Sequence, residues 1–287
     1  MKIYILPIDS KLQPDSQKFE YPAGNSDYGV EQDFLRYIST KSLATDSPTE
    51  AGWHYLPVFW TRWHLNHNYG KEGLKELQAE VSKSLIDPQR TFTICQYDDG
   101  PVIDLGPVTV FLASRKTKAG LDIPLLRNPL KTPFFKPRKQ YLASFVGRLD
   151  THPIRKQMAM ALEGRDDIMI SDGDKGQKFF VNETLRSYTA LCPRGYGGSS
   201  FRFYEAMQLG IAPLLIGDID TRPFKKYIAW DSVSFYIKNA EKLPALLDGL
   251  DKKRLKYMGS MAKKTYMNHL QYGKWGDYVI KELETTS

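Results

Sequence analysis

The stretch that decides the fold is Leu191-Cys192-Pro193-Arg194-Gly195-Tyr196-Gly197-Gly198-Ser199-Ser200-Phe201-Arg202-Phe203-Tyr204-Glu205-Ala206-Met207-Gln208-Leu209-Gly210. An apolar run, a glycine-rich loop and an amphipathic run that stops at a glycine predict a strand, a loop and a helix. The apolar run over residues 211–218 predicts another buried strand. This order is typical of a parallel sheet covered by helices.

The glycine-rich loop has the chemistry of an anion site. The first N–H groups of a helix have no partner inside the helix, and the helix dipole favours negative charge in front of them. Gly195, Gly197 and Gly198 allow positive φ and leave no Cβ between backbone and ligand. Ser199 and Ser200 can cap the helix. The loop therefore predicts a site for a nucleotide diphosphate.

Charged residues flank the loop. Arg194 and Arg202 can each make two hydrogen bonds to phosphate. Glu205 follows Arg202 by three positions, so the two share a helix face, and the carboxylate suits ribose hydroxyls. The alternative is an ordinary loop in which Arg202 and Glu205 form an ion pair.

Strands and helices alternate along the rest of the chain, which predicts two parallel α/β sheets with helices on both faces. Strands are expected at residues 2–8, 55–60, 91–96, 108–113, 141–146, 167–171, 189–192 and 235–237. Helices are expected at residues 29–38, 74–85, 153–162, 182–188, 243–250 and 252–284.

A proline-rich connection divides this pattern. It contains Pro124, Pro129, Pro133 and Pro137, mixed with lysines. We expect a domain boundary here, with a first Rossmann-like domain over residues 1–135 and a second over 136–287, whose C-terminal helix packs back on the first. Ligands of such sheets bind at the carboxyl ends of the strands, so the nucleotide site is expected in the second domain, facing a cleft between the two.

Composition restricts the class of protein. The 287 residues carry a net charge of +7, which favours acidic partners such as nucleotide diphosphates and anionic glycans. Cys95 and Cys192 are far apart and predict buried free thiols of a reducing compartment. No apolar run approaches the roughly 18 residues of a membrane span, so we expect a soluble, cytoplasmic protein without a membrane anchor.

The motif from Cys192 to Pro213, C-P-R-G-x-G-x-x-S-x-R-x-x-E-A-x-x-x-G-x-x-P, is similar to the signature of the exostosin-like glycosyltransferases. Pro223 to Trp230 resembles that family's P-F-x-x-x-I-x-W segment, and residues 143–155 resemble its F-x-G strand and following arginine. The resemblance covers residues 141–237. It extends to small soluble members, of the kind that large algal viruses encode.

This resemblance implies the GT-B fold and an inverting glycosyltransferase. Such an enzyme moves a sugar from a UDP-sugar, with UDP-xylose as the first choice, to a hydroxyl of a glycan acceptor. It adds Arg148 and Arg155 to the residues expected at the donor. These two arginines, with Arg194 and Arg202, supply positive charge, so neither a metal nor another cofactor is expected.

A base must take the proton of the acceptor hydroxyl. Asp98 and Asp99 follow a buried strand directly, and two carboxylates so close raise the pKa of one of them. The turn resembles the family's D-x-G-P, which matches Asp98 to the base and leaves Asp99 as the second choice. The alternative is an acidic β-turn before Gly100-Pro101.

Aromatic and histidine residues of the first domain are candidates for the acceptor site. They are His54, Trp63 and His64, and the alternative is that the tryptophans belong to the core with exposed histidines. Two Asp-x-Asp motifs, at residues 172–174 and 218–220, are candidates for a metal.

Two other classes of protein stay open. A nucleic-acid-binding protein explains the basic charge and the 13% aromatic content, but the cations follow no continuous run. A nucleotide-binding module without catalysis explains the glycine loop and needs no base.

Overall fold

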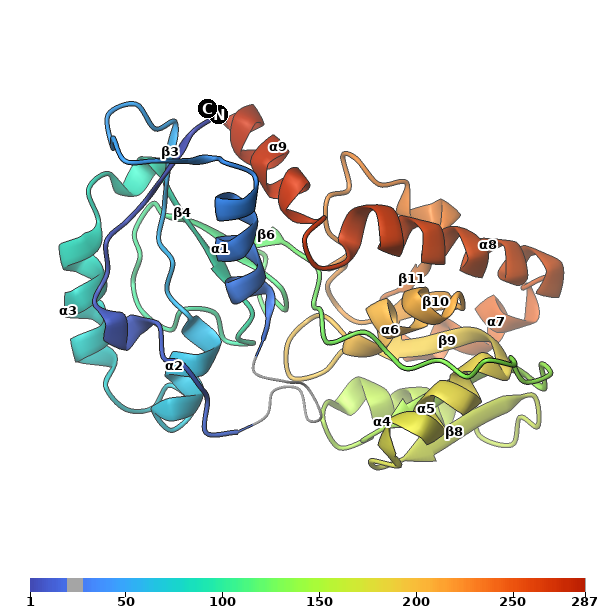
Figure 1. The fold of residues 1–287 in the computed structure, drawn as a ribbon. Coiled ribbons are helices and arrows are strands. Elements are labelled where there is room, and N and C mark those ends of the chain that lie inside the picture. The colour runs from blue at the N-terminus through green and yellow to red at the C-terminus, as the bar shows by residue number, and fades with distance from the viewer. Residues whose placement is uncertain (20–27, 287) are drawn as a thin grey trace. The chain divides into compact units, whose positions relative to one another are not determined.

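The structure is a computed structural model that describes residues 1–19 and 28–286. By its internal contacts the chain forms two compact units. The first comprises Met1–Asn128 and Tyr272–Ser287, and the second comprises Pro129–Gln271. Each unit contains one sheet with helices packed against it (Figure 1).

The sheet of the first unit is parallel throughout, in the order β2-β1-β3-β4-β5-β6. Its strands are β1 Ile3–Ile5, β2 Ala44–Thr45, β3 Trp53–Tyr55, β4 Thr91–Cys95, β5 Thr109–Leu112 and β6 Leu121–Asp122. The helices of this unit are η1 Ser10–Leu12, α1 Val30–Thr40, α2 Trp60–Asn66, α3 Leu74–Ser84, η2 Pro88–Arg90 and α9 Gly276–Thr286.

The sheet of the second unit is also parallel, in the order β11-β10-β9-β7-β8. Its strands are β7 Tyr141–Gly147, β8 Ile168–Asp172, β9 Ser187–Pro193, β10 Ala212–Ile216 and β11 Phe235–Ile237. The helices of this unit are α4 Pro153–Ala161, α5 Gly176–Leu185, α6 Phe201–Leu209, η3 Trp230–Ser232, η4 Ala240–Lys242, α7 Leu243–Asp248, α8 Lys252–Thr265 and η5 Tyr266–Leu270.

The strand order of the second unit contains a topological switch point between β7 and β9. The chain leaves β7 toward β8 on one side and leaves β9 toward β10 on the other. Right-handed crossovers therefore place α4 and α6 on opposite faces of the sheet. Ligands of open α/β sheets bind at the carboxyl ends of the strands beside such a switch point.

Close packing fixes α8 against this sheet. Gly259 of α8 lies on the backbone of Gly210 and Ala212, where a Cβ would overlap the Gly210 carbonyl oxygen. Gly210 ends α6 with a φ of 76°, which glycine adopts without strain. The helix predicted between the glycine-rich loop and Gly210 is confirmed, with its glycine stop.

The prediction of two parallel α/β sheets is confirmed, and most expected elements lie within a few residues of their positions. The strand expected over 55–60 is wrong, because β3 ends at Tyr55 and Trp60 already begins α2. The helix expected over 182–188 begins earlier, at Gly176. The single helix expected over 252–284 is also wrong, since Gly273, with a φ of 74°, lies in the turn between η5 and α9.

Both cysteines are buried free thiols, as expected. Burial raises the pKa of the Cys95 and Cys192 thiols well above the usual value, which keeps them protonated. Within the described residues, no helix is both long and apolar enough to cross a bilayer.

The core of the first unit depends on Phe34 of α1. Its ring is fully buried and contacts the rings of Tyr55, Phe92 and Trp275 at centroid distances of 5.3, 5.8 and 5.4 Å. Trp275 precedes α9, so Phe34 joins the C-terminal residues to the sheet.

We expect Phe34→Ala to lower the free energy of unfolding by about 3–5 kcal/mol, because it leaves a cavity among these rings. Phe134→Ala is the matched control, since that ring is 92% exposed and its loss opens no cavity. Urea unfolding followed by tryptophan fluorescence measures both changes. Equal stability of the two variants would contradict the role given to Phe34.

Candidate functional site

The glycine-rich loop joins the carboxyl end of β9 to α6, beside the switch point. The amide of Gly195 donates to the carbonyl of Ser199 at 3.1 Å, which closes the loop on itself. The Thr221 hydroxyl donates to the carbonyl of Gly198 at 3.3 Å. These bonds hold loop carbonyls in place and orient the loop amides.

Arg194 binds the backbone of the loop to which it belongs. Its side chain is buried, and its Nε donates to the carbonyl of Gly197 at 3.1 Å, while a terminal nitrogen forms an ion pair with Asp218. Burial raises the pKa of Asp218, but the hydrogen bond and charge of Arg194 outweigh burial and hold that pKa below its usual value. In this structure Arg194 therefore supports the loop.

Ser200 is the N-cap of α6, but its side chain makes no capping bond. Its hydroxyl is buried and has no hydrogen-bond partner in the described part of the chain. A buried polar atom without a partner is costly, and a bound ligand is one explanation for it. The side-chain cap expected at this residue is absent, and Ser199, also buried, does not replace it.

The three loop glycines do not need positive φ, which corrects that part of the sequence argument. Gly195 matters through its missing Cβ, which would lie 3.5 Å from the Arg155 guanidinium. A side chain there would cover that guanidinium. The glycine therefore keeps a cation accessible beside the loop.

Arg155 of α4 joins the ends of the two strands that flank the switch point. Its nitrogens donate to the carbonyls of Arg194 at 2.9 Å, Arg148 at 2.8 Å and Pro193 at 3.4 Å. Burial, with the charge of Arg202, lowers the pKa of Arg155 to about 10. Among the described ion pairs none involves Arg155, so the site has excess positive charge.

Arg202 lies in the first turn of α6, as predicted. Its Nε donates to the carbonyl of Val146 at 2.9 Å, and its guanidinium carbon lies 4.1 Å from the centre of the Phe180 ring. It forms an ion pair with Glu205, whose carboxylate is fully buried. The Arg202–Glu205 ion pair that the sequence analysis gave as the alternative to ligand binding is therefore present. The Glu205 carboxylate has no exposed surface for a ribose.

Arg148 follows β7 and is the most exposed of the predicted arginines. It pairs with Asp150 at 2.8 Å, with both side chains about 60% exposed. Such a pair stabilises the fold little. Arg148 can exchange this partner for a phosphate at small cost.

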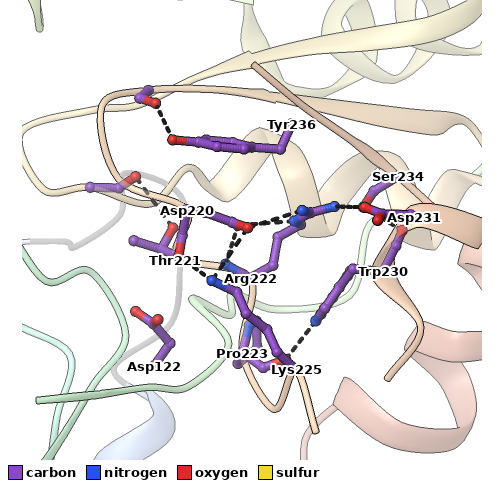
Figure 2. A network of polar contacts seen from close by, with 12 residues as sticks. Asp122, Asp220, Thr221, Arg222, Pro223, Lys225, Trp230, Asp231, Ser234 and Tyr236 are labelled. Atoms are coloured by element: carbon purple, nitrogen blue, oxygen red, sulfur yellow. Dashed lines mark hydrogen bonds and ion pairs between the residues drawn. The ribbon is translucent and has the colours of Figure 1, made fainter. Parts of the chain in front are cut away.

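Sequence reasoning missed a polar network on the segment after β10 (Figure 2). Arg222 is buried and binds both carboxylate oxygens of Asp220 at 2.9 Å, with further bonds to Asp231 and Ser234 at 3.2 Å. Lys225 contacts Asp220 at 3.3 Å. The signal was present in the sequence, since Arg222 stands directly before the P-F-x-x-x-I-x-W segment.

Two aromatic side chains donate hydrogen bonds to the backbone around the same segment. The indole of Trp230 donates to the carbonyl of Pro223 at 2.6 Å, and the Tyr236 hydroxyl donates to Gly217 at 2.9 Å (Figure 2). Phe224 has a φ of 55°, which is rare for a residue with a side chain. The network therefore holds a strained turn on the segment that follows β10.

Neither Asp-x-Asp motif presents two uncommitted carboxylates. Asp218 pairs with Arg194 and Asp220 with Arg222, while Asp172 accepts from the amide of Leu149 at 2.8 Å. Over residues 1–19 and 28–286, no three His, Cys, Asp or Glu side chains gather as a metal site requires. Metal independence itself stays a prediction.

In the first unit, Asp98 and Asp99 lie directly beyond β4, at the carboxyl edge of its sheet. They line a hollow of about 460 Å³ together with Gly100, Pro101 and other residues of the turn and of β5. Asp99 is exposed and forms an ion pair with Lys116, whereas Asp98 is half-buried. The two carboxylates, of which the sequence analysis ranked Asp98 first, thus differ in exposure and in partner.

The three residues expected to bind the acceptor are all in the core of the first unit. The exposed fractions of His54, Trp63 and His64 are 1%, 4% and 0%. Burial lowers the pKa of His64 to about 4, so the ring is neutral. The tryptophan fits the core alternative, but these histidines are not exposed. Buried side chains present no surface to a glycan, which argues against the acceptor role.

The fold and the geometry together define a parallel α/β protein with a basic, glycine-rich loop at a switch point. Residues 115–249 match the Exostosin GT47 domain, and this part of the chain belongs to that glycosyltransferase family.

Curated relatives agree with this assignment. The chain is 31% identical over 159 residues to the exostosin-1 homolog of Caenorhabditis elegans, covering 47% of this chain and 42% of that protein. It is 25% identical over 124 residues to a probable glucuronosyltransferase of Oryza sativa subsp. japonica, covering 39% and 29%. The chain thus spans less than half the length of each of these relatives. They are animal and plant proteins, and the likeness to viral members stays a prediction.

Solved structures give weaker likenesses. The crystal structure of TarM matches with a TM-score of 0.37 and 9% identity, over 69% of this chain and 54% of that one. MurG of Acinetobacter baumannii matches with a TM-score of 0.39 and 10% identity, over 88% and 76%. Scores this low support no inference about this chain.

The Asp220–Arg222 pair makes stability depend on pH. Burial raises the pKa of Asp220, but Arg222 outweighs burial, so the folded pKa lies below the unfolded value of about 3.9. The pair therefore stabilises the fold fully above pH 4, and this contribution is lost as the pH falls through the folded pKa.

We expect Asp220→Asn to be less stable than the wild type at pH 7, and the difference to shrink below pH 4. Thermal unfolding measured across this range checks the trend. Asp231→Asn is the control, because that carboxylate is 96% exposed and contributes little. A difference that does not change with pH would contradict the assignment.

Proposed function

We propose that this chain is an inverting glycosyltransferase whose second unit binds a UDP-sugar at the switch point. The observation that carries the proposal is the meeting there of three features. They are the guanidinium of Arg155, the buried hydroxyl of Ser200, and the loop amides at the start of α6. Among the described residues, Arg155 has no carboxylate partner and the Ser200 hydroxyl has no hydrogen-bond partner. Together they suit a diphosphate, whose charge the excess positive charge balances.

The donor site uses the loop residues in different ways. Arg155, with Arg202 close to it, faces the diphosphate, and Ser200 donates its hydroxyl to a phosphate oxygen. Arg194 acts through the loop that it holds, and Arg148 adds a contact from the end of β7. A ribose contact with Glu205 requires a rearrangement on binding that both breaks its pair with Arg202 and exposes its buried carboxylate.

The proposed reaction is a single displacement at the anomeric carbon of the donor sugar. Asp98 takes the proton of the acceptor hydroxyl as its oxygen forms a bond to the anomeric carbon. The bond from that carbon to the diphosphate breaks on the opposite side, and UDP leaves with the electron pair. The arginines and amides stabilise the negative charge that develops on the leaving group. In this proposal no metal is needed to stabilise the negative charge on the leaving UDP.

The donor sugar has two candidates. The resemblance favours xylose, whereas two relatives are described as glucuronosyltransferases, one of rice and one of Arabidopsis thaliana. Both UDP-sugars therefore belong in the assay. The acceptor is proposed to be a glycan, on the strength of the family alone, and the cytoplasm remains the proposed compartment.

UDP binding tests the donor site. We expect UDP to raise the unfolding midpoint without added metal, by an amount that reaches about 2.7 kcal/mol at one hundred times the dissociation constant. Arg155→Met removes charged hydrogen bonds and should weaken UDP binding about 10–100-fold.

Arg165→Ala is the matched control for this test. Arg165 is an arginine of the same unit that pairs with Asp167 and Asp248, and its loss should leave the UDP-induced shift unchanged. No shift with UDP, GDP, CMP or ADP would refute the donor site. A full shift in a folded Arg155→Met variant would refute the role of that residue.

Slow transfer of the sugar to water tests the base, since it releases UDP without a known acceptor. Asp98→Asn should reduce UDP release about 10²–10⁴-fold while the UDP-induced thermal shift stays intact. Glu76→Gln, an exposed carboxylate of the same unit, should change neither. If Asp99→Asn reduces UDP release more than Asp98→Asn does, the base is Asp99. Unchanged UDP release in both variants would contradict the mechanism.

A further inference from the structure

One surface of the second unit concentrates the positive charge of the chain. It consists of residues 131–139 and the exposed face of α8, and we call it the basic–aromatic surface. These two segments contain no Asp or Glu. Their cations are Lys131, Lys136, Arg138, Lys139, Lys252, Lys253, Arg254, Lys256, Lys263 and Lys264.

These ten cations account for the basic character of the protein. The chain has 40 Lys and Arg residues against 33 Asp and Glu residues. Without the two segments, 30 basic residues stand against the same 33 acidic ones, which leaves the rest of the chain slightly negative. The positive net charge is therefore a local property of this surface, although the cations form no run in the sequence.

The two segments meet in space. The ammonium groups of Lys139, Lys252 and Lys256 lie 5.7, 5.6 and 5.6 Å from the centre of one ring, that of Tyr188. Further along α8, Lys263 lines a hollow of about 420 Å³ together with Phe134 and other residues. These contacts bring cations from both segments together on one side of the second unit.

Carboxylates do not neutralise these cations. In the described ranges, none of the ten forms an ion pair within 4 Å. Asp167 acts on Lys252 from a distance but is itself paired with Arg165. Burial, with the charges of Lys136 and Lys256, lowers the pKa of Lys139 to about 8. Cations held this close attract a polyanion.

Two aromatic side chains project from the same surface. Phe134 and Phe135 are 92% and 82% exposed, with ring centroids 4.9 Å apart and ring planes at 85°. Pro133 and Pro137 flank them and restrict the backbone. Two fully exposed adjacent rings are unusual on a folded protein and mark a contact with an apolar phase.

We propose that the basic–aromatic surface binds the surface of an anionic lipid bilayer. Phe134 and Phe135 enter the boundary between headgroups and acyl chains, and the ten cations contact lipid phosphates and carboxylates. This combination of an apolar insertion and a polybasic surface is what stable peripheral attachment requires. The attachment would hold the enzyme at a membrane through its second unit.

The ring geometry favours lipid over single-stranded nucleic acid, the other polyanion that uses aromatic residues. Successive bases stack on rings that present parallel faces. Rings at 85° to each other cannot both do so for neighbouring bases. Insertion into a bilayer has no such requirement, because burial of apolar area has no direction.

Co-sedimentation of the full chain with vesicles tests this proposal. We expect binding to phosphatidylcholine vesicles that contain about one third phosphatidylserine, weaker binding as salt is raised, and little binding to phosphatidylcholine alone. Phe134→Ser with Phe135→Ser should weaken binding at least about tenfold. Lys136→Glu with Arg138→Glu should weaken it by a similar factor.

Matched variants control for general effects. Lys71→Glu with Lys75→Glu makes the same change in charge on the exposed surface of the first unit, and Ile86→Ser removes an exposed apolar side chain there. Both should bind vesicles as the wild type does. All the substituted side chains are exposed, so every variant should keep the UDP-induced thermal shift. A loss of vesicle binding can then be distinguished from a failure of the donor site.

Three results would overturn the proposal. They are the absence of binding to anionic vesicles, equal binding by the double serine variant, and equal loss of binding in the controls. Tight, salt-dependent binding of an oligonucleotide that the double serine change abolishes, without vesicle binding, would assign the surface to nucleic acid instead.

Discussion

The site of the second unit depends on the hydrogen bonds that Arg155 donates to the backbone carbonyls at the ends of β7 and β9. These two strands are hydrogen-bonded neighbours, and the chain leaves them in opposite directions. A cation that binds carbonyls instead of carboxylates keeps its charge uncompensated. The same residue can thus hold the strand ends in position and attract an anion.

The glycine loop follows the same principle. Side chains from Arg194 and Thr221 bind loop carbonyls. Peptide groups whose oxygens point inward present their N–H groups to the other side. Ser200, whose hydroxyl is buried without a partner in the described residues, adds a donor or acceptor at the start of α6. These side chains hold the glycine-rich backbone in one conformation. Its amides can then bind a ligand without reorganisation.

Sequence patterns predicted the two sheets and the position of the loop, because strands, glycines and helix periodicity are local signals. They did not predict which charged groups pair. Arg202 and Glu205 were predicted to share a helix face, but only the structure shows that the carboxylate is fully buried. His54 and His64 resemble exposed binding residues in sequence, and burial depends on contacts with distant segments. The concentration of cations on α8 and residues 131–139 was also missed, since the two segments are more than one hundred residues apart in the chain.

Gly259 restricts which substitutions the buried face of α8 can accept. Any side chain at that position would displace α8 from the end of α6, so the buried face of α8 tolerates little change. The opposite face carries exposed cations, Ser260 and Tyr257, which is 68% exposed. Homologous chains can therefore gain or lose surface charge on α8 without moving the helix whose first turn carries the proposed donor site. The proposed attachment to a membrane and the proposed recognition of a nucleotide therefore rest on separate elements, which selection or engineering can change independently.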